Sequence, residues 1–154
     1  MGKGRINRFS GPTAFLSNFF VEKDGKTAEH RFQAAKASNS REREWVLSAP
    51  TPGEAKQRGR RIQLPSDFER EVLEEMIMAK VLRIKFQDVG LRAKLLATGY
   101  LELVHGNHWH DVEWGVCNGL CQSGPHPPFG KNRLGQMLMN VRQTYREEEL
   151  CSQE

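Results

Sequence analysis

The apolar residues near the end of the chain recur at helical spacing, and this pattern constrains the fold more than any other. They fall at i, i+3, i+4, i+7 and i+11, and they are Leu134, Met137, Leu138, Val141 and Tyr145. Residues at this spacing share one face of a helix. The spacing therefore predicts an amphipathic helix over about residues 133–148 that packs on a core.

Start and stop signals predict five more helices upstream, beginning near residues 28, 41, 51, 66 and 88. Thr51, Pro52 and Glu54 form the signature of a capped helix start, and residues 66–69 repeat it. Gly99 is expected to end the helix that Asp88 begins. The longest helix, about 66–86, is expected to face the core with Phe68, Val72, Met76 and Ala79, flanked by Leu73 and Ile77.

Strand signals are few and short. The first twenty-odd residues suit extended structure and turns, with a hairpin-like excursion at Asp24-Gly25. Residues 100–104 alternate like a strand, and 113–117 are its expected partner across a turn. A loop rich in Gly and Pro follows over 119–130. We therefore expect an α+β fold, predominantly helical, in a single domain over residues 1–154 with its core at about 9–145.

Composition limits the class of protein. The chain has 154 residues, 38% of them hydrophobic and 27% charged, which suits one soluble globular domain. It contains no apolar run long enough to cross a bilayer, and no apolar stretch of signal-peptide length follows the basic N-terminus. An odd count of three cysteines does not suit a disulfide framework. These features predict a cytoplasmic protein without a membrane partner.

Net charge favours anionic partners. The net charge is +4, and the excess of basic over acidic residues is concentrated in Lys56, Arg58, Arg60 and Arg61. Such a cluster could contact phosphate, or it could be a solvated helix end. Both interpretations stay open at this point.

A polar stripe runs along the helix predicted from residue 28. Glu29, Gln33 and Lys36 lie at i, i+4 and i+7, next to the apolar face. A carboxylate, an amide and an amine on one face could line a wall of a cleft. The alternative is a surface face with an ordinary Glu–Lys pairing.

A second polar and aromatic segment spans residues 107–115. Trp109 and Trp114 could stack on a flat base, and Asn107 could read the edge of that base by hydrogen bonds. The alternative is that one or both tryptophans fill the core.

The same region carries residues that bind metals, namely His105, His108, His110, Cys117 and Cys121. Zinc would accept four of them, but the spacing matches no familiar zinc finger. In addition, His108 and His110 would share one face of an extended stretch, which leaves little room for the tetrahedral geometry of a zinc site. Nothing in the sequence places either thiol beside a base that would lower its pKa. We therefore expect no metal ligands and no cofactor.

The start of the last helix is a candidate phosphate site. Backbone amides there, with Lys131 and Arg133, could hold an anion. The segment lacks the glycine arrangement of a P-loop or of a dinucleotide-binding fingerprint.

Six motifs in order resemble one known family. They are the segments Phe15–Phe19 (FLSNF), Glu29–Lys36 (EHRFQAAK), Thr51–Lys56 (TPGEAK), Leu95–Gly99 with Leu103-Val104, Asn107 to Val116, and Asn132 to Met139. Together they cover nearly the whole chain, from about residue 9 to 145. The sequence resembles the NADAR family of N-glycosidases. It departs from the family at His110, where glycine is frequent, and in the number of prolines between residues 125 and 130.

The resemblance implies a hydrolase that cleaves an N-glycosidic bond to a phosphorylated ribose. The resemblance leaves two possible substrates. One is a phosphoribosylamino-pyrimidine of riboflavin synthesis. The other is ADP-ribosyl-guanine in nucleic acid, in which case ADP-ribosylated DNA is a partner. The resemblance implies catalytic roles for Glu29, Lys36 and Asp111. The expected substrate contacts are Asn18, Gln33, Asn107, Trp109, Trp114, Lys131 and Asn132.

A mechanism follows from the chemistry of that bond. Its cleavage builds positive charge on the ribose ring, which a carboxylate can stabilise while a second group protonates or holds the departing base. Glu29 and Asp111 are the candidates for these roles. Lys36 could bind the phosphate, or its amine could attack an opened sugar as a Schiff-base nucleophile.

The alternative to an N-glycosidase is a protein that is not an enzyme. A non-catalytic nucleotide- or nucleic-acid-binding module with a structural zinc would also use aromatic and basic residues. Metal analysis of the purified protein distinguishes the two. The sequence carries no indication of oligomeric state.

Overall fold

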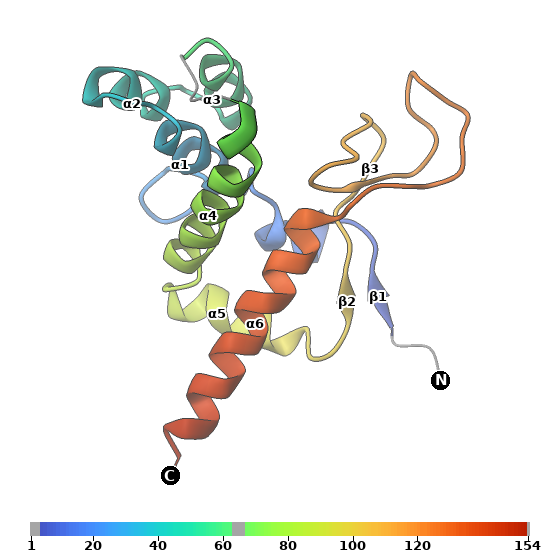
Figure 1. The fold of residues 1–154 in the computed structure, drawn as a ribbon. Coiled ribbons are helices and arrows are strands. Elements are labelled where there is room, and N and C mark those ends of the chain that lie inside the picture. Colours follow the sequence, from blue (N-terminus) through green and yellow to red (C-terminus); the bar gives the residue numbers. More distant parts are fainter. Residues whose placement is uncertain (1–3, 63–66, 154) are drawn as a thin grey trace. The chain divides into compact units, whose positions relative to one another are not determined.

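The computed structural model describes residues 4–62 and 67–153, which form two compact units. The central unit consists of residues 18–87, and the terminal unit combines residues 1–17 with 88–154. The described residues are mostly helical with short strands (Figure 1). The prediction of a predominantly helical α+β fold is therefore confirmed. The prediction of a single domain over 1–154 stays a prediction.

The central unit is built from helices. Its elements are α1 (Ala28–Ala35), α2 (Ser40–Leu47), α3 (Pro52–Gly59) and α4 (Asp67–Lys85). Helix α1 packs against the other three (Figure 1). Buried small and aliphatic side chains form one cluster of its core: Ala34, Ala37, Val46, Ala49, Ala55 and Ile62.

Local signals place these helix starts where the sequence predicted them. The Thr27, Asn39 and Thr51 side chains each accept a hydrogen bond from the backbone N–H three residues on. The predicted turn before α1 is also confirmed, because Val21 and Thr27 form an antiparallel bridge and Gly25 has a φ of +80°. Of the start signal at residues 66–69, Ser66 lies outside the described residues.

The predicted core-facing stripe of α4 is wrong in part. Val72 and Met76 are 62% and 56% exposed, and Ala79 is exposed as well. Ile77 is buried as expected, but the face that is buried with it carries Met78, Val81 and Leu82, and the buried Phe86 follows directly after the helix. The helix has apolar residues on more than one face, so spacing alone did not identify the buried one. The Phe68 side chain lies outside the described residues.

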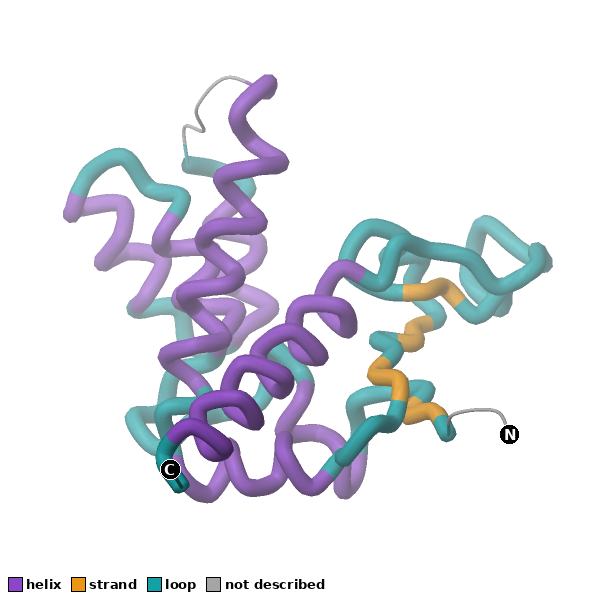
Figure 2. Tube along the Cα trace, turned by 60° about the horizontal axis from the view of Figure 1, so that its bottom comes forward, coloured by secondary structure: helices purple, strands orange, loops and turns teal. Residues whose placement is uncertain are grey.

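The terminal unit contains the strands. Its elements are β1 (Arg5–Ile6), a 3-10 helix η1 (Gly11–Leu16), α5 (Val89–Ala97), β2 (Glu102–Leu103), β3 (Gly106–Asn107), β4 (Val116–Cys117) and α6 (Arg133–Cys151). Most of the chain between β3 and α6 is loop (Figure 2). Asp88 caps α5 and Gly99 follows it with a φ of +61°, so both predicted limits of that helix are confirmed.

The predicted strand pairing is wrong. Strand β2 pairs in parallel with β1, with Arg5 opposite Glu102, and β4 pairs in parallel with β3. The first strand of the chain thus takes the place beside β2 that residues 113–117 were expected to fill. Local alternation identifies a strand but carries no information on its partner.

Helix α6 confirms the pattern that constrained the fold most. All five of its predicted apolar residues are buried, and the helix packs against β2 and α5. Gly135 makes the approach to β2 possible, because a Cβ there would lie 2.1 Å from the Leu103 carbonyl oxygen. Within the part of the chain that is described, no helix is long and apolar enough to cross a membrane.

Candidate active site

The predicted site residues form two groups, one within each unit. The central unit holds Asn18, Glu29, Gln33 and Lys36, on α1 and the segment before it. The terminal unit holds the remaining six: Asn107, Trp109, Asp111, Trp114, Lys131 and Asn132.

Glu29 is a buried carboxylate in the first turn of α1. It is 7% exposed, and its Oε1 accepts a hydrogen bond of 2.7 Å from Gln33 Nε2. An acidic side chain in the first turn of a helix interacts favourably with the partial positive charge of the helix N-terminus. The stripe is therefore not an exposed Glu–Lys face, because Glu29 and Gln33 are both buried.

Gln33 is held in place by the close approach of α3. A Cβ at Gly59 would lie 2.1 Å from Gln33 Oε1, so only glycine leaves room for this side chain. The Gln33 side chain that donates to Glu29 therefore fits closely against α3.

Lys36 lies at the C-terminal end of α1 among groups that favour its charged form. Its Nζ is 3.3 Å from Glu74 Oε1 and 4.2 Å from the centre of the Phe32 ring. Burial is the largest influence and lowers the pKa of Lys36, whereas Glu74 and Glu29 oppose it. The result is an ammonium group with a lowered pKa in a partly desolvated setting.

Asn18 offers an acceptor that the protein itself leaves unused. Its buried Oδ1 has no hydrogen-bond partner among the described residues, while its Nδ2 lies 3.7 Å from Met78 Sδ. An unsatisfied buried polar atom costs about 1–3 kcal/mol. A donor group on a ligand would remove that cost.

In the terminal unit, Asn107 fixes the turn that carries Asp111. Asn107 Nδ2 donates to the Asp111 carbonyl at 2.8 Å, and its Oδ1 accepts from the Asp111 amide at 3.0 Å. Asp111 Oδ1 in turn accepts from the Trp114 amide at 2.9 Å. The Asn107 side chain therefore positions Asp111, and base reading by Asn107 stays a prediction.

The two tryptophans differ in their surroundings. Trp109 is 57% exposed, with the edges of His105 and His108 against it, so the alternative that it fills the core is wrong. Trp114 is half-buried, and the Arg133 guanidinium lies 4.3 Å from the centre of its ring. The indole ring of Trp109 is the more accessible surface for stacking.

The start of α6 does not provide the expected phosphate site. The amides of residues 131–134 donate to the carbonyls of residues 112–115, because the preceding loop folds back over the helix end. Lys131 Nζ is 3.0 Å from Glu113. The Asn132 side chain accepts from the His105 amide and donates to the Leu103 carbonyl. The amides are thus occupied, and Asn132 holds the backbone.

The basic cluster of α3 is partly engaged as well. Arg58 contacts Glu54 and donates to the Trp45 carbonyl at 2.6 Å, with its guanidinium 5.3 Å from the centre of the Trp45 ring. For Arg58 these contacts favour the helix-end interpretation over phosphate binding.

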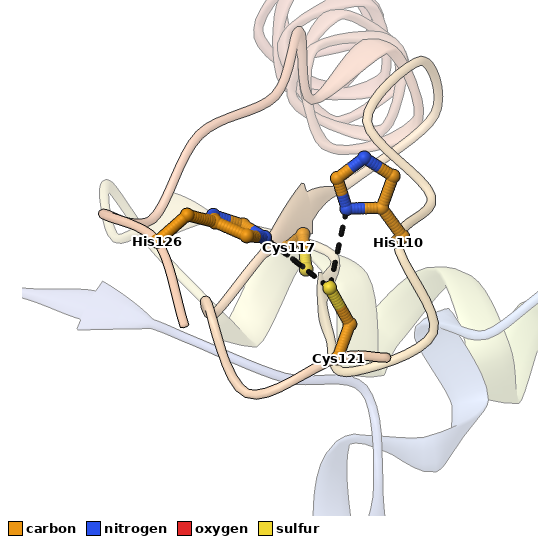
Figure 3. Close-up of side chains that lie close together, drawn as sticks. All are labelled: His110, Cys117, Cys121 and His126. Atoms are coloured by element: carbon orange, nitrogen blue, oxygen red, sulfur yellow. Dashed lines mark hydrogen bonds between the residues drawn. The ribbon is translucent and has the colours of Figure 1, made fainter. Parts of the chain in front are cut away.

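Three members of one further group, His110, Cys117 and Cys121, were named from the sequence, and the fourth, His126, was missed. His110, Cys117, Cys121 and His126 bring their side chains together in the loop between β3 and α6 (Figure 3). The expectation that neither thiol lies beside a base is wrong, because Cys121 Sγ is 3.2 Å from His126 Nε2. Partial burial would raise the pKa of Cys121, but hydrogen bonds, chiefly with His126, lower it to about 6. The sequence signal that could have identified His126 is the spacing C-x3-C-x4-H, which joins Cys117, Cys121 and His126.

Comparison with known proteins shows that the chain is similar to one protein family and to several individual proteins. The NADAR domain family matches residues 8–146. The N-glycosidase YbiA of Escherichia coli (strain K12) is 39% identical over 135 residues, which cover 83% of this chain and 79% of that protein. A riboflavin biosynthesis protein of Vibrio vulnificus (strain YJ016) is 32% identical over 140 residues, which are 86% of this chain and 36% of that protein. The NMR structure of E. coli YbiA superposes with a TM-score of 0.76 at 36% identity, covering 97% of this chain and 89% of that one.

Proposed function

The chain belongs to the NADAR domain family, and from this premise we propose that it hydrolyses a free phosphoribosylamino-pyrimidine of the riboflavin pathway. Relatives between 37% and 39% identical are named N-glycosidase YbiA, which confirms the predicted family and enzyme class. The protein is an N-glycosidase. This class replaces the alternative of a non-catalytic binding module.

The buried Glu29 carboxylate is the observation that carries the mechanism. Departure of the base leaves positive charge on the ribose ring, and a preorganised anion close to that charge lowers the barrier. Gln33 fixes the orientation of the Glu29 side chain before substrate binds. Water then adds to the anomeric carbon and yields the free sugar phosphate.

Asp111 is proposed as the second group, which protonates or holds the departing base. Its turn is fixed by Asn107, and its Oδ1 is oriented by the Trp114 amide. A carboxyl group held in this way needs little reorganisation during the reaction. Asn107 thus acts through Asp111 as a positioning residue.

The proposed substrate contacts follow from what each side chain has available. The exposed Trp109 ring offers a face for the pyrimidine. Asn18 Oδ1, which has no hydrogen-bond partner in the part of the chain that is described, offers an acceptor for a hydroxyl or amino group. Trp114, Gln33 and Lys131 remain proposed contacts, whereas Asn132 supports the backbone at the start of α6.

Lys36 is proposed to act as a phosphate ligand in its charged form, because Glu74 and the Phe32 ring both stabilise an ammonium group.

The pKa of Lys36 is lowered, so activity should fall as pH rises through that lowered pKa. Lys36→Met should raise KM, and Lys36→Arg should restore most of the binding. Steady-state kinetics between pH 6 and 10 on the three proteins measure this, with the pH range chosen to bracket the usual lysine value.

A Schiff-base role predicts the opposite pH dependence. The neutral amine would attack C1 of the opened sugar, form an imine with that carbon and release the aminopyrimidine, and water would later hydrolyse the imine. Borohydride would then trap a covalent adduct on Lys36 that mass spectrometry detects. Activity that rises over the same pH range, together with such an adduct, would overturn the phosphate role.

A two-substrate assay tests the proposed function. Purified protein is incubated with the phosphoribosylamino-pyrimidine intermediate, or with DNA bearing ADP-ribosyl-guanine, and released sugar is identified by mass spectrometry. We expect ribose 5-phosphate from the first and no ADP-ribose from the second. Turnover should also depend weakly on salt, because a free nucleotide releases few counterions. Release of ADP-ribose with a steep salt dependence would assign the protein to nucleic acid instead.

A further inference from the structure

Four metal-binding side chains converge in the terminal unit, and no step of the proposed reaction uses them. They are His110, Cys117, Cys121 and His126, and their ligand atoms all lie within 4.8 Å of one another (Figure 3). We propose that these four residues bind one zinc ion, which has a structural role.

The distances suit a tetrahedral ion. Cys121 Sγ lies 3.3 Å from His110 Nδ1 and 3.2 Å from His126 Nε2, and Cys117 Sγ lies 3.6 Å from His126 Nε2. With zinc bonds of about 2.3 Å to sulfur and about 2.0 Å to nitrogen, the edges of the tetrahedron are roughly 3.3–3.8 Å. These three distances are close to the spacing that zinc requires, and the remaining pairs of ligand atoms lie within 4.8 Å of one another.

The ring of His126 is oriented for coordination. Its Nδ1 lies 2.7 Å from the Pro127 carbonyl oxygen, which can only accept a hydrogen bond. The proton is thereby held on Nδ1, and the lone pair of Nε2 points toward the two sulfur atoms. A histidine that donates its second N–H to a carbonyl is the usual arrangement at a zinc site.

The backbone adopts unfavourable conformations to bring the ligands together. His110 has a φ of +64°, in the left-handed region that favours glycine. Gly119 has a φ of +86°, and a Cβ there would lie 1.9 Å from the His126 carbonyl oxygen. The segment between Cys117 and His126 can fold back this tightly because residue 119 is a glycine.

The segment that follows Cys117 and carries Cys121 and His126 has no regular secondary structure, and it is ordered by a few hydrogen bonds such as that from the His126 amide to the Gly119 carbonyl. Residues 118–128 contain no helix or strand, and Leu120 is exposed. Four protein ligands would close the coordination shell, which is the arrangement of a structural rather than a catalytic zinc. Both thiols would release their protons to solvent on binding.

Metal content and cobalt spectroscopy of the full chain test this proposal. After incubation with zinc and gel filtration, we expect about one zinc ion per chain in the wild type. Cobalt in place of zinc should give the intense visible bands of a tetrahedral site, together with a thiolate charge-transfer band. Cys121→Ser and His126→Asn should lower the bound metal by about tenfold or more.

Matched variants outside the cluster serve as controls. Cys151→Ser removes the exposed third cysteine, and His108→Asn removes an exposed histidine of the same region. Both should keep the metal content and the cobalt spectrum of the wild type. Wild-type protein with less than a tenth of an equivalent of zinc, or equal zinc in Cys121→Ser and His126→Asn, would overturn the proposal. The wild-type cobalt spectrum decides the matter even where a variant fails to fold.

Discussion

Replacing Glu29 by Gln is expected to lower kcat by about 100-fold or more, while the fold stays intact. The amide has nearly the same shape as the carboxylate, but it carries no charge to stabilise the positive charge that develops on the ribose. Because that charge exists only in the transition state, kcat should fall far more than KM rises. Steady-state release of ribose 5-phosphate, with circular dichroism as the folding check, measures the effect.

The control for this variant is Glu44→Gln, which makes the same chemical change on the exposed surface of α2. It should leave both kcat and the circular dichroism spectrum unchanged. A folded Glu29→Gln protein with undiminished turnover would remove Glu29 from the mechanism, and Asp111 would then be the principal carboxylate to test.

Replacing Lys85 by Met is expected to raise the free energy of unfolding at pH 7 by about 1–3 kcal/mol. The Lys85 side chain is 1% exposed, and its Nζ lies 5.5 Å from the centres of the Phe20 and Phe86 rings. Burial lowers the pKa of Lys85 from 10.5 to about 8, although the charge of Glu22 opposes the shift. Keeping this ammonium group in the folded state therefore costs free energy near neutral pH.

The sign of the pH dependence follows from these values. Below about pH 8 Lys85 is charged in both the folded and the unfolded protein, so the whole cost of burying the charge is present. As pH rises from about 8 to 10.5, the folded state loses its proton first, and wild-type stability gains up to about 3 kcal/mol. The Lys85→Met protein should lack this gain.

Urea unfolding at pH 7 and pH 10 measures both effects as differences between variant and wild type. Lys80→Met, which changes an exposed lysine of the same helix, is the control and should shift neither value by more than about 0.5 kcal/mol. If Lys85→Met instead destabilises the protein equally at both pH values, the ammonium group contributes favourable contacts that outweigh its desolvation.

Motifs in the sequence were sufficient for the family, the enzyme class and the mostly helical fold. They also named Glu29, which is buried, and Asp111, whose turn is held by Asn107. They did not reveal that the amides at the start of α6 are already occupied by loop carbonyls. A motif records which residue types are present, whereas the hydrogen bonds that each one makes depend on chain segments that pack against it.

The sequence by itself determined the features that depend on neighbouring residues. The limits of α5 followed from a cap at Asp88 and a glycine at position 99, and the buried face of α6 followed from the spacing of its apolar residues. A capping hydrogen bond and a helical period both act over a few residues, so they can be recognised without knowing the rest of the fold.

The tertiary structure alone decided the features that join distant or folded-back segments. Strand β2 pairs with β1, whose residues lie 97 positions earlier, and α4 buries the face with Met78 rather than the one with Val72. His126 joins His110 and the two cysteines only because the loop turns back at Gly119. Such choices are made by long-range packing, in which several segments compete for the same surface, and no local pattern records which of them is buried.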